Sequence, residues 1–233
     1  MKTFISFTIV MVVFLVLTSI SLRAQERVEG TYVVFSNDQK IETDEFVVVP
    51  GEMYSDDIRS IGAQEDRRVA NMVCSKGSLV SYEQTLNGLP ATSATNDQKF
   101  FKLFQNEATI GQFSVDEDIL FLDPNMYSQY WFLIKVFEGK KEDKMRFNVC
   151  VPQIQDFVYV DIEKRGSETI HIADKSINAT QYRITVGKKE IISCWTDRDR
   201  LIGMYLTSKN VYVADEKYNQ LYASLKKIVN RAM

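Results

Sequence analysis

A strict alternation of apolar and polar residues is the feature that most limits how this chain can fold. It is clearest in residues 145–151, 158–163 and 180–186, where an apolar side chain occupies every second position. Because successive side chains of a β-strand point to opposite faces, a period of two predicts strands with one buried face. Further runs rich in Val, Ile, Tyr, Phe and Thr predict strands at 30–36, 40–49, 68–74, 78–86, 99–105, 108–115, 168–173, 190–196, 200–206 and 209–214.

Turn residues separate these runs. Asn87-Gly88 is the strongest signal, because both residues tolerate the positive φ of a tight hairpin. Lys76-Gly77, Arg165-Gly166 and Gly187-Lys188 predict further reversals. Between residues 143 and 214 the strands recur every ~10–12 residues without intervening helices, which favours an antiparallel meander over a parallel sheet. We therefore predict a mainly β fold with a minor helical part.

Two segments have the apolar spacing of helices. The first covers residues 124–138, with Asp123 as a candidate N-cap and Pro124 at the first helical position. Its apolar residues occupy two adjacent faces, and a helix that is apolar over so much of its surface is buried or covers an apolar sheet. The second covers residues 216–231 and carries one apolar stripe, which predicts an amphipathic helix packed on the sheet.

Residues 1–24 have the pattern of an export signal. Lys2 is followed by an apolar run from Phe4 to Ile20 and then by Ala24 before a polar residue. Cleavage after Ala24 gives a mature chain in the periplasm or outside the cell, and the lack of a nearby Cys excludes a lipoprotein. The alternative is an uncleaved N-terminal anchor, since a run of about 17 residues is at the lower edge of a membrane-spanning length. We expect residues 25–233 to form a single antiparallel β domain.

The charge of the chain bounds its partners. The net charge of −3 becomes −5 once Lys2 and Arg23 leave with the signal. An acidic chain without a basic stripe is unsuited to nucleic acid or to an anionic membrane surface. The export signal and the apolar helix instead favour a lipid or other apolar small molecule as partner, or another envelope protein, and the sequence leaves the oligomeric state open.

The sequence contains none of the common catalytic or metal-binding motifs. His171 is the only histidine and stands on a predicted strand with no nucleophile motif, so we assign no catalytic residue, no metal and no cofactor. Asp197 and Asp199 could form a hydrolytic carboxylate pair, but we favour a polar hairpin turn between two strands. Cys150 and Cys194 could form a disulfide in an oxidising compartment, and the alternative is that the thiols are free and buried.

Aromatic residues make up 12% of the chain, and they cluster in residues 127–132. Side chains with a large apolar body and a polar tip line apolar ligand pockets, although they also fill cores. The candidate ligand-binding residues are Tyr127, Tyr130, Trp131, Ile134, Tyr182 and Trp195. Tyr130 and Trp131 lie about 100° apart on a helix, and we expect one to pack on the sheet and the other to line a pocket.

The second half of the chain resembles a group of uncharacterised bacterial envelope proteins. The resemblance rests on the order of an aromatic helix from Tyr127, the strand Phe147–Pro152, the long strand pair to Ile172, the strand Gln181–Val186, and Cys194-Trp-Thr-Asp197 running into Leu201. That group is similar in architecture to lipoprotein carriers of the LolA/LolB type, in which a curved antiparallel sheet wraps a helical lid around an apolar cavity. The resemblance implies a half-barrel and transfers no functional residue.

These observations leave three hypotheses about function. The first is an exported non-enzymatic envelope protein that holds a lipid or other apolar ligand in a half-barrel cavity. The second is a structural or protein-interaction module with a fully packed interior, and the third is a secreted hydrolase. A large apolar cavity favours the first, a packed interior the second, and a polar cleft with convergent carboxylates the third.

Overall fold

A computed structural model describes residues 27–49, 51–61, 64–75, 78–97, 99–114, 120–124, 126–172, 175–188, 190–198, 200–218 and 220–232. The predicted export signal lies outside these residues. The first half of the chain forms β1 (Val28–Ser36), β2 (Gln39–Val49), β3 (Glu52–Ile61), β4 (Gln64–Ser75), β5 (Ser78–Leu86), β6 (Leu89–Asn96), β7 (Phe100–Gln105) and β8 (Ala108–Ser114). The second half forms β9 (Leu120–Phe121), α2 (Tyr127–Glu138), β10 (Lys144–Val151), η1 (Pro152–Ile154), β11 (Asp156–Ile172), β12 (Lys175–Val186), β13 (Glu190–Asp197), β14 (Arg200–Leu206), β15 (Val211–Asp215) and α3 (Leu221–Ala232).

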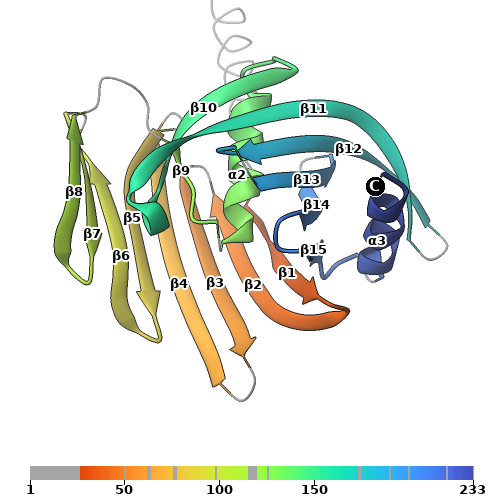
Figure 1. Cartoon of the computed structure of the whole chain (residues 1–233), viewed down its shortest axis with the longest axis horizontal. Helices are drawn as coiled ribbons and strands as arrows, with labels where there is room; N and C mark the ends of the chain where they lie inside the picture. Colours follow the sequence, from red (N-terminus) through yellow and green to blue (C-terminus); the bar gives the residue numbers. More distant parts are fainter. Residues whose placement is uncertain are drawn as a thin grey trace, which may run out of the picture.

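All fifteen described strands belong to one sheet, in the order β8-β7-β6-β5-β4-β3-β2-β1-β15-β14-β13-β12-β11-β10-β9. Two meanders, β1–β8 and β10–β15, are joined through the antiparallel pair of β1 and β15. Only the short β9 runs parallel to its neighbour β10 among these pairs. Figure 1 shows how the sheet curls around α2 without closing. The predicted mainly β fold, with a curved antiparallel sheet, is confirmed.

The two helices pack on opposite faces of this sheet. The concave face carries α2 and an apolar layer that includes Val34, Phe46 and Ile184. The other face carries α3, whose Leu221 and Leu225 are fully buried against the sheet. Both helical predictions are therefore confirmed: a buried aromatic helix and an amphipathic C-terminal helix.

A β-bulge in β11 lets one strand serve both cores. The register with β12 shifts between Lys164 and Gly166, and Gly166 has a φ of +115°. A bulge adds one residue to the strand and so reverses its alternation. Two residues an even number of positions apart normally share a face, but they lie on opposite faces when the bulge is between them. Ile162 therefore packs in the core under α2, whereas Ile170 packs in the core under α3. The predicted chain reversal at Arg165-Gly166 is wrong, because this glycine makes a bulge within a 17-residue strand.

Both helices begin later than the sequence predicts. Asp123 and Pro124 lie in a turn before α2, and the N-cap residue is Met126, without a side-chain cap. In α3, Gln220 has a φ of +70°, a conformation that cannot belong to a right-handed helix, so the helix starts at Leu221. Neither described helix is long and apolar enough to cross a bilayer.

Candidate functional site

Five of the six candidate ligand-binding residues lie together on the concave side of the sheet. Tyr127, Tyr130, Trp131 and Ile134 project from α2, and Tyr182 projects from β12 into the same buried cluster. Figure 1 shows α2 held between the two arms of the sheet, which explains why both apolar faces of this helix are buried.

Trp195 lies apart from the other five. It belongs to the core beneath α3, whereas its neighbour Cys194 faces the core beneath α2. Adjacent residues of a strand point to opposite faces, so Trp195 cannot share a pocket with the aromatic residues of α2. Its indole Nε1 donates a hydrogen bond to Glu168 Oε2 at 3.1 Å.

The three thiols are free, so the Cys150–Cys194 disulfide is not formed. Cys150 is on β10 and Cys194 on β13, with β11 and β12 between them. Strands in a sheet lie about 4.8 Å apart, so three steps separate the two residues by about 14 Å, far beyond the Cα separation that a disulfide spans. Burial raises the pKa of the Cys150 thiol to about 12.

Among the described residues, His171 and Asp197 make ordinary polar contacts at separate places. His171 is exposed on β11, with Nδ1 2.9 Å from Ser176 Oγ. Asp197 Oδ2 accepts a hydrogen bond from the Tyr218 hydroxyl at 3.0 Å, and Asp199 lies outside the described residues. No group of three or more potential metal-ligating side chains occurs among the residues that the structure describes.

The ends of α2 are tied to the sheet by polar contacts. At its start, the backbone N–H of Ser128 donates to Asp44 Oδ2 on β2 at 3.1 Å, and the Ser55 hydroxyl donates to the other oxygen of the same carboxylate. A carboxylate at a helix N-terminus compensates free N–H groups and the helix dipole. At the other end, the Tyr182 hydroxyl donates to Glu138 Oε1 at 2.6 Å.

A buried carboxyl pair lies beside the start of α2. Glu42 on β2 and Asp57 on β3 are 4% and 0% exposed. Burial first, and then the neighbouring Glu42 charge, raise the pKa of Asp57 to about 10, and burial also raises the pKa of Glu42. Both pKa values are raised, so the pair holds a shared proton at neutral pH. Within the described part of the chain, the buried atoms Glu42 Oε1 and Asp57 Oδ1 have no other hydrogen-bond partner.

Two arginines approach this pair from neighbouring strands. Arg59 Nε lies 3.7 Å from Glu42 Oε2, and Arg68 Nη1 lies 3.3 Å from Asp57 Oδ2. Burial raises the pKa of nearby Asp44 to about 6. These residues hold β2, β3 and β4 together beneath the start of the helix. The carboxyl groups of Glu42, Asp44 and Asp57 are too deeply buried to contact a soluble substrate.

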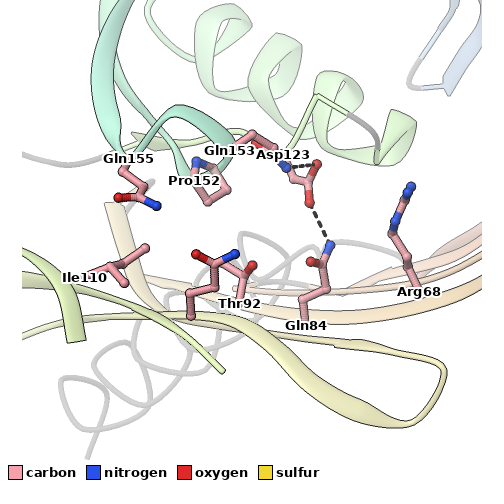
Figure 2. Close-up of a pocket in the computed structure, with 9 residues that line it drawn as sticks. Arg68, Gln84, Thr92, Ile110, Asp123, Pro152, Gln153 and Gln155 are labelled. Carbon is pink, nitrogen blue, oxygen red and sulfur yellow. Dashed lines mark hydrogen bonds between the residues drawn. The ribbon is translucent and has the colours of Figure 1, made fainter. Parts of the chain in front are cut away.

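A polar cavity opens where the two ends of the sheet face each other. Its volume is about 300 Å³, and its lining residues are Arg68, Gln84, Thr92, Gln105, Ile110, Asp123, Pro152, Gln153 and Gln155. Figure 2 shows Gln155, Pro152, Gln153 and Asp123 on one side and Ile110, Thr92, Gln84 and Arg68 on the other. We call this space the seam cavity. None of the six aromatic and apolar residues nominated from the sequence lines it.

Asp123 joins the two walls of the seam cavity. Its Oδ2 accepts from Gln84 Nε2 at 2.7 Å and from the Tyr82 hydroxyl at 3.2 Å. Its Oδ1 accepts from Gln153 Nε2 at 2.5 Å, and its backbone N–H donates to Gln129 Oε1 at 2.6 Å. Asp123 is the single carboxylate in the lining, so the cavity lacks the convergent carboxylates that a hydrolase of the predicted kind needs.

The sequence contained a partial signal for these polar groups. In the predicted strand 40–49, Glu42 and Asp44 occupy the same face as Phe46 and Val48. Acids on the apolar face of a strand indicate a buried polar cluster. The lining of the seam cavity had no such signal, because its residues come from β4 to β8 and from the turns around α2 and η1.

Comparisons with known proteins address the fold. No family model matches the chain, and no curated protein sequence matches it. The chain is similar to the solved structure of a β-barrel-like protein of the domain of unknown function DUF1849 from Brucella abortus. The TM-score is 0.51 at 6% identity, and the match covers 81% of this chain and 93% of that one.

The similarity defines the class of architecture. At 6% identity it concerns the fold alone, and it agrees with the open, curled sheet of Figure 1. The chain has a β-barrel-like fold. The barrel-like architecture expected from the resemblance is thus supported, through a protein other than the lipoprotein carriers.

Proposed function

We propose that the protein is exported, acts in the cell envelope without catalysis, and binds an apolar chain in the place that α2 occupies. The observation that carries this proposal is the position of α2. This helix covers the apolar concave face as a separate element. It makes hydrogen bonds to the sheet at its two ends, at Ser128 and at Glu138. A ligand that displaces the helix gains an apolar surface that is already formed.

The proposed contact residues are those that meet beneath α2. Tyr127, Tyr130, Trp131 and Ile134 move with the helix, whereas Tyr182 remains on the sheet. Trp195 is omitted, because it faces α3. The resemblance to lipoprotein carriers, in which a helical lid covers an apolar cavity, supports an acyl chain as the ligand.

Export is proposed from the sequence of the first 24 residues. A basic start, an apolar run and a small residue at Ala24 are typical of a cleaved signal. Retention of the segment as an anchor would place the same binding function at the membrane surface.

Binding of a fluorescent fatty acid tests the proposal, with Tyr182→Phe as the informative variant. The substitution keeps the ring and removes the hydrogen bond to Glu138, which is worth about 1.5 kcal/mol for a charged acceptor. If the probe binds only when α2 is displaced, the displaced state is roughly tenfold more populated in Tyr182→Phe than in the wild type. The apparent Kd of the probe then falls by the same factor.

Tyr32→Phe provides a matched control. The Tyr32 hydroxyl is also buried and donates to Leu201 O at 3.1 Å, but it makes no tie to α2. This variant should lose similar stability without tighter probe binding. Equal effects of both variants on the apparent Kd would refute displacement of α2.

A second candidate is a structural or interaction module with a packed interior. It is favoured by the near-complete burial of Tyr130 and Ile134, at 1% and 0% exposure. Failure of the wild type and of Tyr182→Phe to bind the probe, together with native mass spectra free of co-purified lipid, would select this function.

A further inference from the structure

We propose that the seam cavity binds a small uncharged sugar or polyol. This inference is independent of the apolar site, because it depends on other residues at the open edge of the sheet. Its volume of about 300 Å³ is at the lower end of the range for small-molecule sites. A single sugar ring with its hydroxyl groups has a suitable size.

Both walls of the cavity supply hydrogen-bonding groups. Gln84, Thr92 and Gln105 lie on three adjacent strands of one wall, because Gln84 pairs with Thr92 and Thr92 pairs with Gln105 in the sheet register. Gln153 and Gln155 lie on the other wall, at and just after η1. An amide offers both a donor and an acceptor, as a hydroxyl does, so a lining of amides and a hydroxyl matches a ligand rich in hydroxyl groups.

The contacts of Asp123 orient two of these amides. Gln84 and Gln153 both give their Nε2 to the buried carboxylate. Their Oε1 atoms are therefore directed away from Asp123 and remain as acceptors (Figure 2). A binding group that is held in place by a second hydrogen bond loses less entropy when a ligand binds.

The lining carries one charged side chain of each sign, Asp123 and Arg68. The Asp123 carboxylate accepts three hydrogen bonds from side chains, and Arg68 Nη1 lies 3.3 Å from Asp57 Oδ2. A charged ligand would add an uncompensated charge to this partly buried site, which is costly. This balance favours a neutral ligand.

The backbone at Gln155 places an amide at the cavity. Gln155 is the C-cap of η1, with φ 54° and ψ 36°, in the left-handed region that Gly or Asn occupies at lower cost. This conformation is common where a helix ends. Here it leaves a long amide side chain in the lining of the cavity.

The test uses Gln155→Gly, because glycine adopts this backbone conformation at lower cost while it removes the amide. The fold should be retained or stabilised, with an unchanged or higher Tm. Gln220→Gly is the matched control, since Gln220 is exposed, has a φ of 70° and precedes α3, away from the cavity. Thr92→Val is a second site variant that removes one hydroxyl at nearly constant volume.

Binding is measured by saturation-transfer NMR and calorimetry with methyl glucoside, methyl N-acetylglucosaminide and glucuronate. We expect at least one neutral glycoside to bind the wild type and Gln220→Gly equally, and each site variant to raise its Kd at least fivefold. No neutral glycoside binding, binding of glucuronate alone, or wild-type affinity in Gln155→Gly would overturn the proposal.

Octyl glucoside separates two sources of the same chemistry. Equal affinity for the methyl and octyl compounds indicates a free sugar. Tighter binding of the octyl compound that is still weakened in Gln155→Gly indicates the sugar headgroup of an amphiphile.

Discussion

Replacing Asp57 by Asn tests whether a shared proton holds the carboxyl pair beneath α2. Asn has the shape of protonated Asp and can donate a hydrogen bond to Glu42. The folded state of the wild type keeps a proton on Asp57 up to a pKa of about 10, because burial and Glu42 oppose its ionisation. The unfolded chain releases the same proton near pH 4.

The sign of the effect follows from proton binding. Between these two pKa values the folded state binds one more proton than the unfolded state, so the free energy of unfolding falls as pH rises. The largest slope that one group can give is about 1.4 kcal/mol per pH unit, or about 3 kcal/mol between pH 6.5 and 8.5. The pKa of Asp44, raised to about 6, adds a slope of the same sign below pH 6, and the positive charges of Arg59 and Arg68 oppose the shifts on the pair.

The assay is urea unfolding at pH 6.5, 7.5 and 8.5. In Asp57→Asn the fall between these pH values should largely disappear, and the variant should be more stable than the wild type at pH 8.5. Asp56→Asn is the control, because Asp56 lies on the same strand, faces the other side and pairs with the mostly exposed Arg67. It should lower stability by about 0–1 kcal/mol and retain the wild-type slope. An Asp57→Asn protein with the full wild-type slope would refute the shared proton.

Two further outcomes test the packing of the fold, and a third tests cleavage of the export signal. Gly203→Ala should destabilise the fold by about 1–3 kcal/mol and speed hydrogen exchange in α3, because the new Cβ would lie 2.6 Å from Leu225 Cδ1; wild-type exchange in α3 would contradict this packing. Trp131→Ala should cost about 3–5 kcal/mol in chemical unfolding through the cavity it leaves, and a loss below 1 kcal/mol would show that this side chain is not core. Mass spectrometry of exported protein should give a chain that begins at Gln25, whereas an intact Met1 would favour the anchor.

The alternation of the sequence predicted most strands because one face of each is apolar. β5 and β14 have the predicted bounds, and Asn87-Gly88 forms the expected hairpin with φ values of 53° and 80°. The sequence did not predict β3. Its inward-facing positions include the polar residues Ser55, Asp57 and Arg59, so the strand lacks a clear alternation of apolar and polar residues.

The position of the candidate site was predictable only in part. The sequence predicted that the aromatic helix is buried, because its apolar residues cover more than one face. The side of the sheet that each strand residue takes depends on bulges such as the one at Gly166, which the sequence does not distinguish from a turn. The seam cavity depends on the curvature of the whole sheet, since that curvature alone brings Gln84 close to Gln153 through Asp123.

The gap between the two edges of the sheet connects the seam cavity with α2. We therefore expect binding at the two proposed sites to be coupled. The edges of the sheet meet through side chains, with the Phe157 ring against Phe113 at a centroid distance of 5.2 Å, and such contacts can separate without breaking a backbone ladder. Asp123 crosses the seam to Gln153, and its backbone N–H holds Gln129 in the first turn of α2. A sugar in the cavity should stabilise these contacts and oppose displacement of the helix. Because coupling of equilibrium binding is reciprocal, the glycoside should raise the Kd of the fatty-acid probe by the factor by which the probe raises the Kd of the glycoside. If neither ligand changes the Kd of the other, binding in the seam cavity is not coupled to displacement of α2.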